Sequence, residues 1–208
     1  MKLVEMPVRE YLNELKSNSP APGGGSVSAL ASAQGIALMM MVCDLTIGRQ
    51  KYAESEELCL EVKEKGKKIL DELQILIDKD TEAYTLVSDS FKLPKETEEE
   101  KKLRSEAIAE ATLTATETPF RTMEISLEGL ALVESLLGKT NVNAASDLGV
   151  AGLNLFAGIK GAWLNVKINL PGVKNLERAE FFREKGKEME SNIQKMLETI
   201  ETKTAELI

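Results

Sequence analysis

The sequence predicts an all-α protein, a single-domain helical bundle with long buried helices that spans residues 1–208. Apolar residues recur at helical spacing along nearly the whole chain, and strand-like alternation is almost absent. Apolar residues make up 43% of the chain but aromatic residues only 4%, so small aliphatic side chains, Leu and Met must fill the core. A chain of 208 residues can bury a substantial core, and no segment is a linker long enough to separate two domains.

The first half of the chain is expected to hold three helices. Pro7 and the apolar residues up to residue 15 predict a short helix that ends before the loop at residues 18–25. A long apolar helix follows from Ser26, which is placed to cap it, to about residue 47, and Gly48 ends it. A third helix is expected from about residue 54 to residue 91, because Pro94 disfavours helical structure at the residue before it.

The second half of the chain continues the helical pattern. Thr97 and Glu100 have the spacing of a capping box, which predicts the start of the next helix. Pro119 either kinks that helix or restarts it as a new one. The remaining helices are expected at about residues 97–117, 119–137, 143–169 and 176–206.

The charge balance and the absence of histidine exclude several classes of function. The 26 basic and 34 acidic residues give a net charge of −8, which argues against a general nucleic-acid or anionic-membrane surface. Because the chain has no histidine, Ser-His-Asp and Cys-His catalysis, His-ligated metals and imidazole proton shuttles are excluded. Cys43 and Cys59 alone make a poor zinc site, so no metal is expected and buried structural thiols are the favoured interpretation.

The N-terminus and the cysteine content favour the cytoplasm. No apolar signal segment is visible, and two cysteines do not form a disulfide scaffold. Residues 27–47 have the length of a membrane span, but Ser28, Ser32, Gln34 and Asp44 interrupt them. We interpret this segment as the central buried helix of a bundle, and expect neither a membrane nor a nucleic acid as a partner.

The glycine-rich turn PAPGGGS at residues 20–26 is the most distinctive short motif. Three glycines permit unusual backbone angles, and the turn leads directly into the long apolar helix. Backbone N–H groups at a helix N-terminus, aided by the helix dipole, bind anionic or carbonyl-bearing ligands. The motif alone is equally compatible with a tight turn of no further function.

Asp80 is the carboxylate that helical geometry singles out. It falls on the same stripe as Leu73, Ile77 and Tyr84, whereas Asp78 points to another side, where we expect it to face solvent. Burial on an apolar stripe raises the pKa of a carboxyl group, which suits an acid/base catalyst near neutral pH. A buried structural aspartate held by a cation or a helix cap is the alternative, and helix geometry does not decide between the two.

A second polar stripe runs along the apolar segment that begins near residue 143. Its members fall within a narrow sector of one continuous helix: Asp147, Asn154, Gly158, Asn165 and Asn169. We favour a polar ligand cavity lined by this stripe, because half-satisfied polar networks are costly in cores. The alternative is a polar seam between helices, including one between subunits.

Positive charge follows the long apolar helix directly. Arg49 and Lys51 come just after Gly48, where cations suit the negative end of the helix dipole. That role is sufficient to explain them, and anchoring a substrate carboxylate is a further option. Asp44, inside the apolar helix, needs a partner that the sequence does not identify.

Taken in order, several of these motifs resemble one protein family. The motifs are PGGGS at residues 22–26, LTIGR at 45–49, IDKD at 77–80 with Ala83 and Tyr84, Ser146 with Asp147, Val150 with Ala151, and NVKINL at 165–170. Their order and spacing are similar to those of the formiminotransferase-cyclodeaminase C-terminal family, from about residue 5 to residue 200. The resemblance implies an all-helical protein that forms a homodimer or higher homo-oligomer through its helices and takes a small-molecule folate as substrate.

The resemblance also implies an activity. Formiminotetrahydrofolate cyclodeaminase converts 5-formiminotetrahydrofolate to 5,10-methenyltetrahydrofolate and releases ammonia; the family also includes methenyltetrahydrofolate cyclohydrolase, which is the alternative, and a non-catalytic folate-binding oligomer is a third interpretation. Larger members carry a formiminotransferase domain that these 208 residues do not contain, so a separate formiminotransferase is a candidate partner. Such a pair of activities would belong to histidine degradation and one-carbon metabolism.

The family's proposed catalytic aspartate, the second of the paired motif, falls on Asp80. One carboxylate can remove the proton from N10 and deliver one to the departing nitrogen, so neither metal nor cofactor is expected. Arg49 and Lys51 are candidates for binding the glutamate tail. The residues expected to contact the pterin or the formimino group are Gly23, Gly24, Gly25, Ser26, Asp147, Asn165 and Asn169.

Overall fold

A computed structural model describes residues 2–208 and confirms the all-α class, with no strand in that range. Its α-helices are α1 (Val8–Leu15), α2 (Gly24–Asp44), α3 (Glu56–Phe91), α4 (Glu98–Leu136), α5 (Ala145–Asn169) and α6 (Leu176–Leu207). Short 3-10 helices are η1 (Leu3–Glu5), η2 (Gln50–Ser55), η3 (Val142–Ala144) and η4 (Leu170–Gly172). The expected helix positions are therefore confirmed to within a few residues.

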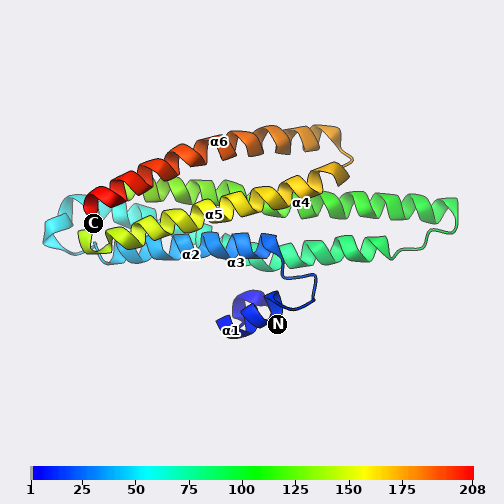
Figure 1. The fold of residues 1–208 in the computed structure, drawn as a ribbon, viewed down its shortest axis with the longest axis horizontal. Helices are drawn as coiled ribbons and strands as arrows, with labels where there is room; N and C mark the ends of the chain where they lie inside the picture. Colours follow the sequence, from blue (N-terminus) through cyan, green and yellow to red (C-terminus); the bar gives the residue numbers. More distant parts are fainter. Residues whose placement is uncertain (1) are drawn as a thin grey trace.

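Four of the helices form the core of the bundle. Helices α2, α3, α4 and α5 each pack on the next, and α5 closes the ring against α2. Helix α6 lies along α4 and α5 on the outside, and α1 stands beside the bundle near the start of α2 (Figure 1). Helices α3 and α4 continue well past the start of α2 as a long hairpin (Figure 1). The bundle is consequently thinner beyond the N-terminus of α2.

Small residues let α2 and α5 approach closely along antiparallel paths. A Cβ on Gly158 of α5 would collide with Ser32 of α2, and a Cβ on Gly35 of α2 would meet the carbonyl oxygen of Ala151 at 2.7 Å. The buried hydroxyl of Ser32 pairs with Ser126 of α4 at 2.7 Å. The middle of the polar stripe on α5 is therefore a seam between helices, which is the alternative to the ligand cavity favoured from the sequence.

Helix α4 continues through Pro119 as one helix, so the restart, one of the two alternatives for this residue, is wrong. Proline lacks the N–H that would bond to the carbonyl four residues earlier, which is that of Ala115. The side-chain amide of Asn169 donates to this carbonyl oxygen at 2.8 Å and replaces the missing bond. At the start of the helix, Thr97 and Glu100 form the predicted capping box.

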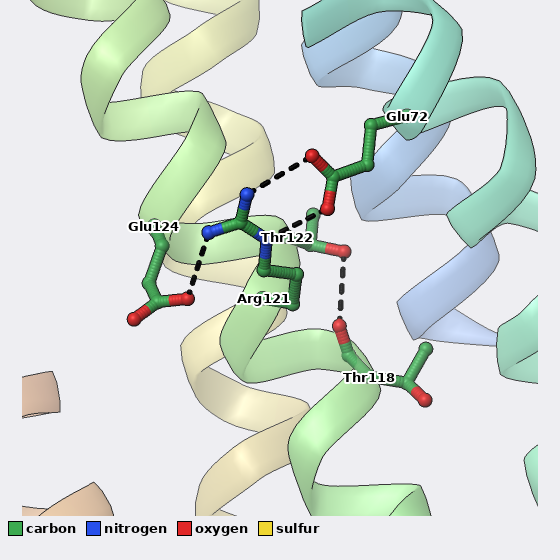
Figure 2. A network of polar contacts seen from close by, with 5 residues as sticks. All are labelled: Glu72, Thr118, Arg121, Thr122 and Glu124. Carbon is green, nitrogen blue, oxygen red and sulfur yellow. Dashed lines mark hydrogen bonds and ion pairs between the residues drawn. The ribbon is translucent and has the colours of Figure 1, made fainter.

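An ion-pair network joins α3 to α4 on the outer side of the bundle (Figure 2). The guanidinium of Arg121 donates to both carboxylate oxygens of Glu72, at 2.7 and 3.0 Å, and to Glu124 at 3.2 Å. The side chains of all three residues are about two-fifths exposed, so solvent screens the attraction and its contribution to stability is modest. Its two-pronged geometry nevertheless fixes the register of α3 against α4.

The start of α2 differs from the prediction. The helix begins at Gly24 with Gly23 as its N-cap, and no side chain caps it, so the expected capping role of Ser26 is wrong. Ser26 is instead the third residue of the helix, and its side chain is fully buried against α3. A backbone of three glycines can enter the helix early because none of them carries a side chain that would meet α3 or α5.

Two helices have the length and composition of membrane spans. They are α2, with a mean hydropathy of 1.6, and the segment Val142–Gly172, with 1.2. About half of each is buried inside the bundle, 56% and 44% respectively. Core helices of water-soluble proteins meet the same criteria, so this observation is weak support for a membrane location.

Candidate active site

Asp80 lies opposite the first turn of α2, where Ser26 holds it. The backbone N–H of Ser26 donates to Oδ2 of Asp80 at 2.8 Å. The Ser26 hydroxyl is 3.2 Å from the same oxygen and 2.8 Å from the carbonyl oxygen of Ile77, one turn earlier on α3. The N–H of Ser26 is one of the four at a helix N-terminus that have no partner within the helix. The carboxylate of Asp80 thus acts as an external cap of α2.

The environment of Asp80 shifts its proton affinity upward. Burial raises the pKa of this carboxyl group above its ordinary value, and the two hydrogen bonds from Ser26 offset only part of that effect. No lysine or arginine forms an ion pair with Asp80 in residues 2–208. A carboxyl group of this kind exchanges its proton closer to neutral pH than an exposed one.

The glycines of the turn are required by what packs against them. A Cβ on Gly25 would collide with the Asp80 carboxylate, and a Cβ on Gly24 would lie 3.1 Å from the side-chain amide of Asn165. Asn165 is held by its own helix, because its NH₂ group donates to the carbonyl oxygen of Gly161 at 2.9 Å. The turn therefore brings Asp80 of α3 and Asn165 of α5 to the same end of α2.

This end of α2 can interact with polar ligand groups. The first bond within the helix is donated by the N–H of Val27 to Gly23, so the N–H groups of Gly24 and Gly25 precede the helical pattern. Gly24 is exposed, and the positive end of the helix dipole lies here. Because α3 and α4 extend beyond this point, the site lies where α2 begins beside the long hairpin of α3 and α4 (Figure 1).

Asp78 and Asp80 point in different directions, as helical geometry predicted. The expectation that Asp78 faces solvent is wrong in part, because its side chain is half-buried. Its Oδ1 accepts a hydrogen bond from the backbone N–H of Leu3 at 2.6 Å. The first carboxylate of the motif thus holds the N-terminal segment, and the second faces the start of α2.

Three predicted site residues lie at the other end of the bundle within one chain. Asp147 is in the first turn of α5, about 27 Å along the helix from Asn165 at 1.5 Å per residue. Arg49 and Lys51 follow the C-terminal end of α2, about as far from Gly25, and both are exposed. The predicted residues thus form two groups, one at each end of the antiparallel pair α2 and α5.

The remaining predicted residues have contacts of their own. One N–H of the Asn169 side-chain amide is used on Ala115, so the side-chain oxygen and the second N–H are left for a ligand. Asp44, for which the sequence offered no partner, forms an ion pair with Lys63 of α3. Cys43 and Cys59 are free, fully buried thiols, as favoured from the sequence. Burial raises the pKa of Cys43 to about 12, so this thiol stays protonated.

A cavity of about 420 Å³ lies elsewhere, in the outer groove between α3 and α4. Its lining includes Glu72 and Arg121 of the ion-pair network shown in Figure 2, together with Lys79 and Glu117. Arg121 already pairs with Glu72, and Glu117 with Arg178, whereas Lys79 and Glu82 of the lining form no ion pair among residues 2–208. The site around Asp80 is the stronger candidate because it holds a partly buried carboxyl group with a raised pKa at the start of a helix.

Sequence reasoning missed two contributors at the Asp80 end. The pairing of Ser26 with Asp80 joins residues 54 positions apart, and no local pattern signals such a contact. The sequence pattern places Tyr11 on the apolar face of the first helix, yet its hydroxyl is buried without a hydrogen-bond partner among residues 2–208. A tyrosine on an apolar stripe is too common in cores to be a signal by itself.

Comparisons with known proteins show the family of this chain. Residues 7–191 match the family model described as formiminotransferase-cyclodeaminase. The methenyltetrahydrofolate cyclohydrolase of Methylorubrum extorquens is 40% identical over 183 residues, which is 88% of this chain and 86% of that protein. The formimidoyltransferase-cyclodeaminase of Gallus gallus is 33% identical over 172 residues, 82% of this chain but only 32% of that protein.

A solved structure supports the fold. The crystal structure of formiminotetrahydrofolate cyclodeaminase from Thermotoga maritima matches with a TM-score of 0.88 over 99% of both chains, at 23% sequence identity. An identity this low supports the fold alone. The family match covers most of the chain, and two relatives exceed 30% identity over more than four-fifths of it. The chain therefore belongs to the formiminotransferase-cyclodeaminase family.

Proposed function

We propose that this protein is a formiminotetrahydrofolate cyclodeaminase with Asp80 as its acid/base group. The observation that carries the proposal is the buried Asp80 carboxyl group, whose pKa is raised and which is fixed at the start of α2 by Ser26. It lies beside a glycine turn that leaves the N–H groups of Gly24 and Gly25 outside the helical pattern. A fixed proton carrier beside hydrogen-bond donors is what closure of a folate ring requires.

The proposed reaction needs one proton removed and one delivered. N10 of 5-formiminotetrahydrofolate attacks the carbon of the protonated N5-formimino group (–CH=NH₂⁺), and a new C–N10 bond forms. Ionised Asp80 accepts the proton from N10, and the same carboxylic acid then protonates the nitrogen that leaves as ammonia. The product is the 5,10-methenyl bridge. Because one carboxyl group can serve both steps, we propose that no metal ion or cofactor takes part.

Other residues of this end would orient the substrate. The N–H group of Gly24, which is exposed, suits a carbonyl or other acceptor of the pterin or formimino group, whereas Gly25 is buried beside it. The side-chain oxygens of Asn165 and Asn169 would accept hydrogen bonds from the substrate, and each side-chain amide keeps one N–H after its bond within the protein. Holding N5 and N10 in the closing geometry lowers the entropic barrier to ring formation.

The cyclohydrolase reaction is a second candidate, and a specific observation favours it. The Methylorubrum extorquens protein, which is matched over nearly its whole length, bears that name. In this reaction water adds to the methenyl carbon and the bond to N5 breaks, which yields 10-formyltetrahydrofolate. Asp80 would activate the water as a general base. Both reactions therefore use the same carboxyl group and the same folate atoms.

An assay with both substrates tests the proposal. The purified protein would receive 5-formiminotetrahydrofolate, and ammonia and the methenyl absorbance would be followed against a buffer control. In parallel it would receive 5,10-methenyltetrahydrofolate, and loss of that absorbance would be followed. Ammonia release faster than in buffer supports the cyclodeaminase. Turnover of the methenyl compound alone supports the cyclohydrolase, and folate binding without turnover of either supports a non-catalytic folate-binding oligomer.

We also propose that the functional unit is a homodimer built on α2 and α5. Both helices are strongly apolar, yet each leaves one stripe in solvent. On α5, Leu164 is 62% exposed and Ile168 is 77% exposed. The other exposed apolar residues of the two stripes are Val27, Met41, Leu45, Val150 and Leu153. Contiguous apolar stripes of this kind mark interaction surfaces, and a second copy is the simplest partner for them.

Charge and symmetry support this partner. A two-fold axis near the middle of the stripes would set the Arg49 end of one copy against the Asp80 end of the other. The cations of Arg49 and Lys51, and the carboxylate of Asp147, would then border the site around Asp80 of the partner copy. A folate carries its glutamate carboxylates far from N10, and these cations suit them. The two groups of predicted residues would belong to one shared site.

The setting of the reaction follows from the same proposal. A folate enzyme of this type would act in the cytoplasm, where one-carbon metabolism takes place. If the substrate is the formimino compound, a separate formiminotransferase must supply it, and the pair would take part in histidine degradation. Accumulation of formiminated folate in cells that lack this protein would support that setting.

A further inference from the structure

The N-terminal arm, residues 2–15, covers a second hollow next to Asp80. The arm consists of η1 and α1 and lies across the flank of α2 and α3 (Figure 1). The N–H of Leu3 is bonded to Asp78, and the Leu3 side chain packs against the hydrophobic core. The arm is therefore attached to α3 only two residues from Asp80.

A cavity of about 410 Å³ lies between the arm and the bundle. Met6 and Tyr11 line it from the arm, Leu30 and Ala37 from α2, and Ile77 from α3. The carbonyl oxygen of Ile77 is an acceptor for the Ser26 hydroxyl, and Asp80 follows one helical turn later. The cavity thus adjoins the candidate site, and its volume is within the range of small-molecule sites, about 300–1,000 Å³.

Tyr11 adds a buried polar group to this wall, which is mainly apolar and also includes the exposed residues Gln34 and Gln74. The residue is only 6% exposed, and its hydroxyl is buried with no hydrogen-bond partner among residues 2–208. Burial and, to a lesser extent, the negative charge of Asp80 raise the pKa of Tyr11, so the hydroxyl remains a protonated donor. A buried donor without an acceptor is unfavourable in the free protein, which is typical of groups that serve a ligand.

We propose that this cavity binds the p-aminobenzoyl ring of the folate and that the Tyr11 hydroxyl donates a hydrogen bond to its amide carbonyl. This inference rests on the proposed function. The p-aminobenzoyl group is a flat apolar ring with one carbonyl acceptor, which matches a mainly apolar cavity with one buried donor that has no partner among residues 2–208. The pterin carries several donors and acceptors and suits the polar turn at Gly24 and Gly25 better. N10, bonded to the p-aminobenzoyl ring, then lies next to Asp80.

The first test compares Tyr11→Phe with Tyr52→Phe. Loss of the Tyr11 hydroxyl removes no bond in the free protein, so we expect an unchanged or higher midpoint of thermal unfolding. At the same time KM for the folate rises about 2- to 12-fold, the equivalent of one hydrogen bond. The Tyr52 hydroxyl accepts a bond from the N–H of Val142 at 3.1 Å, so Tyr52→Phe should lower stability and leave KM unchanged. An unchanged KM in Tyr11→Phe would overturn the inference.

A second test separates the two rings of the folate. p-Aminobenzoylglutamate and a reduced pterin without side chain serve as competitive inhibitors of wild-type protein and Tyr11→Phe. We expect weaker inhibition of the variant by p-aminobenzoylglutamate only. If inhibition by the pterin is the one that weakens, the assignment of the cavity to the p-aminobenzoyl ring is wrong.

Filling the cavity gives an independent result. Ala37→Leu adds a side chain at the exposed edge of the cavity and should weaken inhibition by p-aminobenzoylglutamate without loss of stability. Ala131→Leu, at an exposed position on α4, is the matched control and should behave as wild type. If the wild type is active and neither Tyr11→Phe nor Ala37→Leu changes binding of the folate or its fragment, this inference alone is overturned. A wild type inactive on both folates would overturn the proposed function, and the inference with it.

Discussion

The backbone N–H of Ser26 and the carboxylate of Asp80 join the start of α2 to α3 across 54 residues of sequence, at 2.8 Å. This one contact connects the glycine turn with the carboxyl group that the helical pattern singled out. It also explains why the turn needs no capping side chain of its own, because α3 supplies the cap. The same bond stabilises ionised Asp80, whereas burial favours the protonated form.

Removing the Ser26 hydroxyl should shift this balance. In Ser26→Ala the backbone bond to Asp80 remains, but the hydroxyl bonds to Asp80 and Ile77 are lost. We expect a loss of about 1 kcal/mol in the free energy of unfolding. We also expect the acidic limb of the pH profile of kcat/KM to move to higher pH, because the pKa of Asp80 rises. Ser28→Ala, which loses only a bond to Gly24, should leave that limb in place.

Gly25→Ala should disturb folding and the site together. The added Cβ would collide with the Asp80 carboxylate, which must move, and we expect a cost of about 1–3 kcal/mol in the free energy of unfolding. Gly23→Ala is the stability control, because its Cβ would have an ordinary contact of 3.9 Å with Pro20. The penalty of Gly25→Ala should shrink in an Asp80→Ala background, and a double-mutant cycle measures that coupling. An equal penalty in both backgrounds would contradict the collision.

Asp80→Asn should abolish turnover and stabilise the fold at neutral pH. Loss of an acid/base group lowers kcat by about 100- to 10,000-fold. A carboxyl group whose folded-state pKa is raised stabilises the fold below its unfolded value, near 3.8, and this stabilisation is lost as pH rises through the folded pKa. Ionised Asp80 therefore lowers stability at pH 7. In urea unfolding, the free energy of unfolding of Asp80→Asn should exceed that of the wild type at pH 7 and equal it near pH 3.5. Near-normal activity in Asp80→Asn would refute the acid/base assignment.

Asp78→Asn and Asp78→Ala test whether the Asp78 side chain holds the N-terminal arm. The asparagine keeps an oxygen that can accept from the N–H of Leu3, so activity and stability should change little. The alanine lacks this oxygen, so the start of the arm should detach more readily. Amide hydrogen exchange at Leu3 reports this, and protection should fall in Asp78→Ala only. Equal protection in both variants would mean that Asp78 does not hold the arm.

The sequence was sufficient to place the helices and to predict that Asp80 and Asp78 point in different directions, because both depend on local spacing. Apolar periodicity places each helix, and the same periodicity separates Asp80 from Asp78 on one turn. The capping box at Thr97 is equally local, and it is confirmed. Continuity of α4 through Pro119 is not local, since it depends on Asn169 of another helix reaching the carbonyl of Ala115.

Contacts between distant segments account for the other differences. A stripe on one helix cannot reveal which neighbour covers each of its turns, so Gly158 proved to lie in a seam against Ser32 rather than in a cavity. The bond between Asp78 and Leu3 depends on how the N-terminal arm folds back on α3. The family resemblance places Arg49 and Asp80 in one site, although within one chain the two residues lie at opposite ends of the bundle.

The apolar stripes on α2 and α5 predict a defined effect on assembly. Leu153, 45% exposed on α5, would be buried between copies, so Leu153→Glu should convert dimers to monomers. Leu60, 53% exposed on α3, lies on another face, and Leu60→Glu should leave assembly unchanged. Sedimentation velocity distinguishes the two outcomes. A wild-type protein that sediments as a monomer would rule out the proposed assembly.

Mixing two inactive variants tests whether the site is shared. One variant carries Asp80→Asn, and the other carries Arg49→Glu together with Lys51→Glu, which should bind folate polyglutamates poorly. In a shared site, a mixed dimer has one site that receives intact Asp80 from one copy and intact cations from the other. Random assembly by co-refolding makes half of the dimers mixed, so activity should recover to about a quarter of the wild-type value, with wild-type KM. If each chain forms its own site, both subunits of every mixed dimer are defective and no activity returns. Co-refolding of two batches of Asp80→Asn is the control for activity that refolding alone recovers.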